Sequence, residues 1–184
     1  MPIGPLMIEH RLIERVILVI KGQVERLETE KKGDLSFVEW VVSFIQGYAD
    51  RCHHGKEENI LFRDIGKKAI SPELKKTMEE LIEEHKLGRK ATAALADGLR
   101  SFRSGDTHAL SLIVANLKFL IEFYPRHIEK EDKHFFLPIM GYFSKEEKDA
   151  MLKEGFELDS KLMHGEYEKR VSELRPVLAR VLDT

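Results

Sequence analysis

The sequence has a single cysteine, Cys52, and its longest aliphatic run, residues 16–20, is short. One cysteine excludes an intramolecular disulfide, and a run of that length cannot span a bilayer. The first residues also lack the basic-then-apolar layout of a signal peptide, because Glu9, His10 and Arg11 interrupt it early. We therefore expect a cytoplasmic protein with no membrane partner.

The chain also lacks a strong charge of either sign. Its formal net charge is −2, and the basic residues are spread along the sequence. A nucleic-acid partner is not expected, because such proteins carry clustered Lys and Arg. With 42% apolar and 34% charged residues in 184, the composition is typical of one globular domain, 1–184, rather than of a disordered chain.

Alternating strand patterns of useful length are absent, and helix signals dominate. Ser36-x-x-Glu39 and Ser144-x-x-Glu147 have the form of capping boxes. Ser71-Pro72 pairs a capping serine with a proline suited to the first helical turn. These signals predict helices over about 5–31, 36–67, 72–103 and 107–138, and a fifth helical region that Gly155 and Pro176 break into pieces.

Four long helices with short connections predict an all-α fold, an antiparallel four-helix bundle. We expect the bundle to occupy residues 6–140. The additional C-terminal helical segment, 144–182, would pack across the bundle or mediate association into a homo-oligomer.

The chain repeats itself internally. Residues 53–62 read HHGKEENILF and residues 127–136 read HIEKEDKHFF. A shift of 74 residues places His53 on His127 and Glu57 on Glu131. A shift of about 75 places His10, in the first helix, on His85, in the third. Each half of the chain therefore offers a lone histidine on one helix and His-x-x-x-Glu on the next.

Residues four apart share one face of an α-helix. His53 with Glu57, and His127 with Glu131, can therefore each direct an imidazole and a carboxylate at one point. His10 lies on a stripe with Ile13 and Ile17, so it should face inward. Antiparallel pairing of the two hairpins would gather four histidines and two glutamates inside the bundle.

Four neutral imidazoles and two carboxylates suit iron, and two carboxylates can bridge two metals. We expect two iron ions, with oxide, hydroxide or water completing their coordination. Without metal, burial of Glu57 and Glu131 would cost roughly several kcal/mol. Phe62, Phe135 and Phe136, which follow the two motifs, are expected to form an apolar wall that keeps the site dry.

The ordered set His10, His53-x-x-x-Glu57, His85, His127-x-x-x-Glu131 resembles the hemerythrin-like proteins, the hemerythrin HHE cation-binding family. The resemblance covers roughly residues 6–140. It implies a four-helix bundle with a non-haem di-iron centre that binds or reacts with dioxygen or related small oxidants. It also implies that His10 and His53 ligate one iron, that His85 and His127 ligate the other, and that two carboxylates bridge them.

Two positions depart from the oxygen-carrying members. Those proteins have a second histidine one turn from the third-helix histidine, where this chain has Leu81 and Arg89. They also end on His-x-x-x-x-Asp, a spacing that Asp132 satisfies, so Asp132 competes with Glu131 for the bridge; the repeat favours Glu131.

The absent histidine leaves one iron a ligand short. His134, three residues after Glu131, and His164, in the C-terminal segment, are candidates for that ligand. His54 lies about 100° around an α-helix from His53, so we interpret it as a residue outside the ligand set or on the surface.

Three functional hypotheses follow. The first is a di-iron protein that senses, scavenges or turns over dioxygen, peroxide or nitric oxide, with weak catalase-like activity as one form. The second is an iron-responsive helical interaction module whose metal site is mainly structural. The third, a ferritin-like carboxylate enzyme, ranks last, because Glu131-x-x-His134 is the one Glu-x-x-His pair among the candidate ligands.

Overall fold

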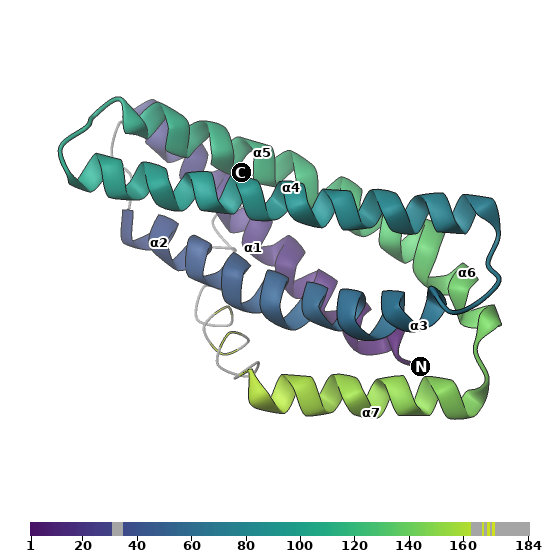
Figure 1. Ribbon diagram of the computed structural model, residues 1–184. Coiled ribbons are helices and arrows are strands. Elements are labelled where there is room, and N and C mark those ends of the chain that lie inside the picture. Colours follow the sequence, from purple (N-terminus) through teal and green to yellow (C-terminus); the bar gives the residue numbers. More distant parts are fainter. Residues whose placement is uncertain (31–34, 163–166, 168, 170, 172–184) are drawn as a thin grey trace.

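The computed structural model describes residues 1–30, 35–162, 167, 169 and 171. Within these residues the secondary structure is helical, and no strand is present (Figure 1). The predicted all-α class is confirmed. The helical elements from α1 to η4 form four long segments, and Figure 1 shows that successive segments run in opposite directions.

The first and third long helices are regular. They are α1, Ile3–Glu30, and α4, Pro72–Arg103. The second and fourth are interrupted by wider π-helical turns. The second consists of α2 (Leu35–Phe44), η1 (Ile45–His54), η2 (Glu57–Phe62) and α3 (Arg63–Ile65). The fourth consists of α5 (Ala109–Glu129), η3 (Lys130–Phe136), α6 (Leu137–Ile139) and the short 3₁₀ turn η4 (Met140–Tyr142).

Local capping chemistry fixes two of the predicted helix starts. Ser71 Oγ accepts a hydrogen bond from the Leu74 amide at 3.3 Å, directly before Pro72. At Ser144 the predicted capping box is complete, because the Ser144 and Glu147 side chains each accept a hydrogen bond from the other residue's amide. The start of the second helix differs, since α2 begins at Leu35 and the expected cap Ser36 lies inside it.

The fifth helical region is continuous where it was expected to break. Helix α7, Lys145–Lys161, includes Gly155 in its interior. A single glycine weakens a helix by only about 1 kcal/mol, and Gly155 lies against the Lys56 side chain of the bundle, where tertiary packing supports it. The predicted break at Gly155 is therefore wrong, whereas Pro176 lies outside the described residues.

Two hydrophobic clusters fill the bundle, one toward each end. The larger cluster joins α1, α2, η1, α4 and α5 and includes Ile20, Leu95 and Leu120. The smaller joins the start of α1 to η2, η3 and α7, with Phe135 and Met151 among its members. Polar residues that carry the predicted metal chemistry lie between the two clusters, so apolar packing holds the helices on both sides of them.

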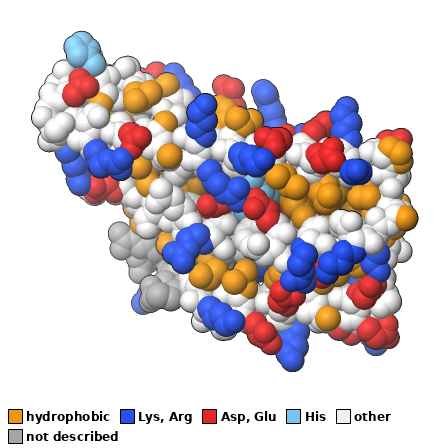
Figure 2. Space-filling model, viewed as in Figure 1, with side chains coloured by type: hydrophobic (Ala, Val, Ile, Leu, Met, Phe, Trp, Pro, Cys, Tyr) orange, Lys and Arg blue, Asp and Glu red, His pale blue; other side chains and the backbone are white. Residues whose placement is uncertain are grey.

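Helix α7 lies along the outside of the bundle beside α3 (Figure 1). Met151 packs into the smaller cluster, and Arg63 and Lys68 pair with Glu154 and Glu147 of α7. On the face of the molecule shown in Figure 2, acidic, basic and hydrophobic side chains are intermixed. Within the described residues, no helix combines the length and apolar character that a membrane crossing needs.

Candidate metal centre

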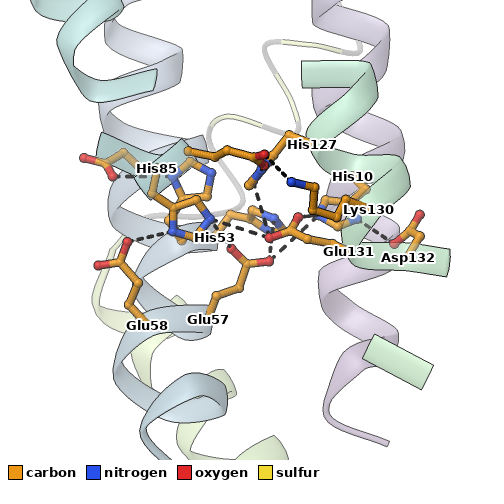
Figure 3. Close-up of polar contacts among 12 residues, drawn as sticks. His10, His53, Glu57, Glu58, His85, His127, Lys130, Glu131 and Asp132 are labelled. Carbon is orange, nitrogen blue, oxygen red and sulfur yellow. Dashed lines mark hydrogen bonds and ion pairs between the residues drawn. The ribbon is translucent and has the colours of Figure 1, made fainter. Parts of the chain in front are cut away.

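Six of the predicted ligands meet in the middle of the bundle (Figure 3). Each is at most 2% exposed. All four long helices contribute, and they supply His10 (α1), His53 (η1), Glu57 (η2), His85 (α4), His127 (α5) and Glu131 (η3). The convergence expected from the internal repeat is therefore what the structure shows, although metal binding by these side chains remains a prediction.

Each glutamate spans both pairs of histidines. Glu57 Oε1 lies 3.2 Å from His53 Nε2, and Glu57 Oε2 lies 3.3 Å from His85 Nε2. Glu131 repeats this arrangement, with Oε2 3.1 Å from His10 Nε2 and Oε1 3.3 Å from His127 Nε2. One oxygen of each carboxylate thus faces the His10–His53 pair and the other faces the His85–His127 pair. Carboxylates in these positions would be able to bridge two metal ions.

The inward-facing atoms are buried without hydrogen bonds. They are the Nε2 atoms of the four histidines and both carboxylate oxygens of Glu57 and Glu131. Buried polar atoms that make no hydrogen bond cost about 1–3 kcal/mol each. Two donors each about 2.1 Å from one metal and at right angles are about 3 Å apart, close to the separations found here. The donor set therefore fits metal ions.

The outer nitrogen of each of these histidines contacts a carboxylate. His10 Nδ1 lies 2.8 Å from Asp132 Oδ1, and His85 Nδ1 lies 2.7 Å from Glu58 Oε1. The Nδ1 atoms of His53 and His127 are each 2.8 Å from Glu9 and Glu84, respectively. A carboxylate on Nδ1 fixes the tautomer and the ring orientation that point Nε2 at a metal.

The sequence did not reveal this role of the four carboxylates, although the repeat marks their positions. Glu9 and Glu84 each precede the lone histidine of their half, and Glu58 and Asp132 each follow the buried glutamate. Each of these carboxylates contacts a histidine on a different helix, so its neighbours in the sequence do not reveal its partner. Basic side chains support them in turn, in the pairs Lys56–Glu9, Lys130–Glu84, Arg11–Asp132 and Arg89–Glu58.

The ionisation of the metal-free centre reflects this crowding of carboxylates. Burial alone would lower the pKa of His53 and His85, but the surrounding carboxylates outweigh it and raise these pKa values to about 10 and about 11. Burial and Glu57 act to raise the pKa of Glu131, yet the three nearby histidines lower it to about 2. Protons on the histidines thus supply positive charge that metal ions would otherwise supply.

This ionisation gives the metal-free protein a distinctive pH dependence. Between the unfolded pKa of about 6.5 and the raised values of about 10 and 11, folded His53 and His85 hold protons that the unfolded chain has lost. Stability therefore falls as pH rises through this window. The stabilisation conferred by bound metal changes with pH in the opposite direction. It increases as pH rises, because protons compete with the metal for the same nitrogens.

Urea unfolding at pH 7 and pH 9 measures both effects. We expect the midpoint of the metal-free protein to fall at pH 9 and the extra stability conferred by bound metal to grow. His54 does not contribute in this window, because burial and the neighbouring His85 lower its pKa well below 6.5. A metal-free midpoint that rises between pH 7 and pH 9 would contradict the assignment of protons to His53 and His85.

Aromatic rings cover the centre on the side of the smaller hydrophobic cluster. The Phe136 ring stacks on His10 with centroids 5.6 Å apart, and the Phe62 ring stacks on His85 at 5.9 Å. Phe135 is fully buried and contacts Phe62 edge-to-face. The three phenylalanines expected from the sequence to form an apolar wall therefore lie where they exclude water from the site.

The structure distinguishes between the two candidate bridges on the fourth helix. Glu131 is fully buried within the cluster, whereas Asp132 turns outward to His10 Nδ1 and Arg11 (Figure 3). Asp132 therefore lies behind a histidine and does not face the position between the two histidine pairs.

The two candidates for the missing ligand fare differently. His134 is exposed and lies outside the buried cluster, so the expectation that it faces the metals is wrong. The reason is local: η3 is a π-helix, whose i→i+5 bonding widens the turn, so three residues no longer nearly complete a turn from Glu131. His164 lies outside the described residues.

His54, which we did not predict as a ligand, lies in the buried centre. His54 is 2% exposed, and it forms a group with His85 and His127 whose potential ligand atoms all lie within 4.8 Å of one another. The wider turn of η1 reduces the angle between neighbouring side chains, so His53 and His54 both face the interior. The doublet His53-His54 in sequence was the available signal, and the assumption of regular α-helix obscured it.

A four-helix bundle that buries at least one histidine on each of its four long helices, with two glutamates between them, has the donor set of a helical metal-binding protein. The model of the hemerythrin HHE cation-binding domain matches residues 1–137, and the chain belongs to that family. No curated protein and no solved structure gives a match.

Proposed function

We propose that the protein binds two iron ions in this centre and reacts with dioxygen, peroxide or nitric oxide, as a sensor, a scavenger or a weak catalase-like enzyme. The observation that carries the proposal is the position of Glu57 and Glu131. In each glutamate, one oxygen faces the His10–His53 pair and the other faces the His85–His127 pair. Family membership supports cation binding in general.

The donor chemistry favours iron. A closed structural zinc site has four ligands, mostly sulfur and nitrogen, whereas magnesium prefers oxygen ligands. Imidazole combined with carboxylate suits iron, and the six protein donors leave coordination positions open for small molecules. When bound, a pair of irons would supply the redox chemistry that no side chain of the cluster can provide.

The surrounding residues would hold this chemistry in place. Carboxylates on the Nδ1 atoms orient the histidines, and Lys56 and Lys130 offset the added negative charge. Phe62 and Phe136 exclude water from one side. A small uncharged oxidant suits such a buried site better than a bulky substrate does.

Elemental analysis and spectroscopy test the proposal. Protein loaded with iron(II) under anaerobic conditions should retain two irons per chain and develop near-ultraviolet oxo-bridge absorption after exposure to air. Stopped-flow mixing with dioxygen, hydrogen peroxide or nitric oxide identifies which oxidant reacts, with zinc-loaded protein as a redox-inactive control. Absence of bound iron, or an iron-loaded protein as inert as the zinc form, would contradict the proposal.

A second candidate is an iron-responsive interaction module, and one contact favours it. Lys56 is 4% exposed and donates hydrogen bonds both to Glu9, behind His53, and to Asp159 of α7, at 2.6 Å for the latter. Metal binding at His53 could therefore alter the docking of α7, which would present a surface to a partner or to a second copy of the chain. The corresponding Lys130 pairs instead with Glu80 and Glu84, both on α4.

A further inference from the structure

The two halves of the centre match at the six predicted ligands that meet in the bundle and differ at the position that follows His53 and His127. A shift of 74 residues relates His53, Lys56 and Glu57 to His127, Lys130 and Glu131. The same shift relates His54 to Ile128, which is 2% exposed and belongs to the larger hydrophobic cluster. His54 is thus a polar residue at a position where the other half of the bundle has an aliphatic one.

The side chain of His54 has little to compensate for its burial. Neither ring nitrogen makes a hydrogen bond, and both are inaccessible to solvent. The ring stacks on His85, with centroids 3.9 Å apart and planes at 15°, and lies 5.7 Å from the His127 ring. A histidine that served only to fill space could be replaced by an aliphatic residue, as at 128, without leaving two buried nitrogens unsatisfied.

The surroundings of His54 resemble those of the other histidines. Its Nδ1 faces a carboxylate, Asp50 Oδ1, at 3.5 Å. Asp50 is in turn held by Arg89 at 2.6 Å, and Arg89 also binds Glu58, behind His85. An acidic residue on the Nδ1 side, supported by a basic residue, also lies behind His10, His53, His85 and His127, where it approaches to 2.7–2.8 Å. A carboxylate on this side leaves Nε2 available to a metal.

We infer that His54 is a third histidine ligand of the metal held by His85 and His127. The inference rests on the proposed two-metal function and deepens it. Position 54 on the second helix would supply the ligand that Leu81 and Arg89, on the third helix, do not. The two metals would then be unequal, because one has three histidines and the other has His10 and His53.

A cavity beside His54 makes the inference testable by chemical rescue. The cavity has a volume of about 190 Å³, and Asp50, His54, Arg89 and Tyr124 are among the residues that line it. Truncation in His54→Ala would join the space of the lost ring to this cavity and admit free imidazole. His54→Ile, which copies the residue at 128, would fill the same space and exclude it.

Iron content and Mössbauer spectra of the ⁵⁷Fe-loaded protein provide the readouts. Reduced wild-type protein should show two doublets of equal area. In His54→Ala the affinity for one iron should fall at least about 100-fold, since loss of a residue behind a ligand already costs about 10–100-fold. Imidazole should restore that iron in His54→Ala and not in His54→Ile, and His134→Ala, at an exposed histidine, should match the wild type.

Retention of two irons and of the wild-type spectrum in both His54 variants would overturn the inference while leaving the proposed function intact. A single doublet from two irons in the wild type would overturn it without any variant. Wild-type protein that takes up no iron would instead overturn both proposals. Circular dichroism of each variant identifies loss of fold, and the wild-type spectrum decides the matter if both variants unfold.

Discussion

Replacement of Glu131 by alanine or glutamine should leave the protein unable to hold two irons, whereas Asp132→Asn should hold both. This difference in iron binding is expected because the two carboxylates lie on different sides of His10. Glu131 has oxygens 3.1 Å from His10 and 3.3 Å from His127, so its loss removes a donor from each metal. Asp132 contacts His10 Nδ1 from behind, and loss of such a partner typically weakens metal binding by about 10–100-fold without removing a ligand.

Competition against a graded series of iron(II) chelators measures both variants on one scale. Glu131→Gln is the more informative of the Glu131 variants, because it preserves side-chain shape while removing the charge. Glu57→Gln should behave like Glu131→Gln, since Glu57 occupies the equivalent position in the first half of the repeat. Loss of iron from Asp132→Asn together with its retention in Glu131→Gln would show that the bridge has been assigned to the wrong residue.

Iron loading should raise the thermal midpoint without creating the helices. A ligand at a thousand times its Kd stabilises the native state by about 4 kcal/mol, which corresponds to a rise in Tm of about 8–16 °C for a chain of this size. The metal-free protein should remain folded, because apolar clusters pack on both sides of the centre, around Leu95 and around Phe135.

Far-ultraviolet circular dichroism with and without iron separates this account from the interaction module. We expect closely similar spectra at 20 °C and distinct midpoints on heating. Zinc loading is a useful comparison, because it supplies positive charge without redox chemistry. Loss of the helical spectrum on removal of iron would favour a metal site whose role is mainly structural, and equal midpoints would argue against metal binding within the bundle.

The fold was predictable because its signals are local. Ser71-Pro72 and Ser144-x-x-Glu147 satisfy the first amides of their helices with their own side chains, so their sequence alone defines where α4 and α7 begin. The absence of a break at Gly155 was not predictable in this way. Its helix is supported by contacts with the bundle, which depend on residues far away in the sequence.

The centre was predictable to the extent that it follows the repeat. Pairs four residues apart and inward-facing lone histidines identified the six buried residues. Facing directions within π-helical turns were not predictable, because nothing in the sequence distinguishes η1 and η3 from α-helix. The wider turn of η1 brings His54 into the interior, and the wider turn of η3 leaves His134 outside it.

Diffraction data collected on either side of the iron absorption edge, from crystals of the iron-loaded protein, test the central claim most directly. The account predicts two anomalous peaks, one beside His10 and His53 and one beside His85 and His127, with an oxygen of Glu57 and of Glu131 next to each. A single peak, or peaks away from these six residues, would contradict it.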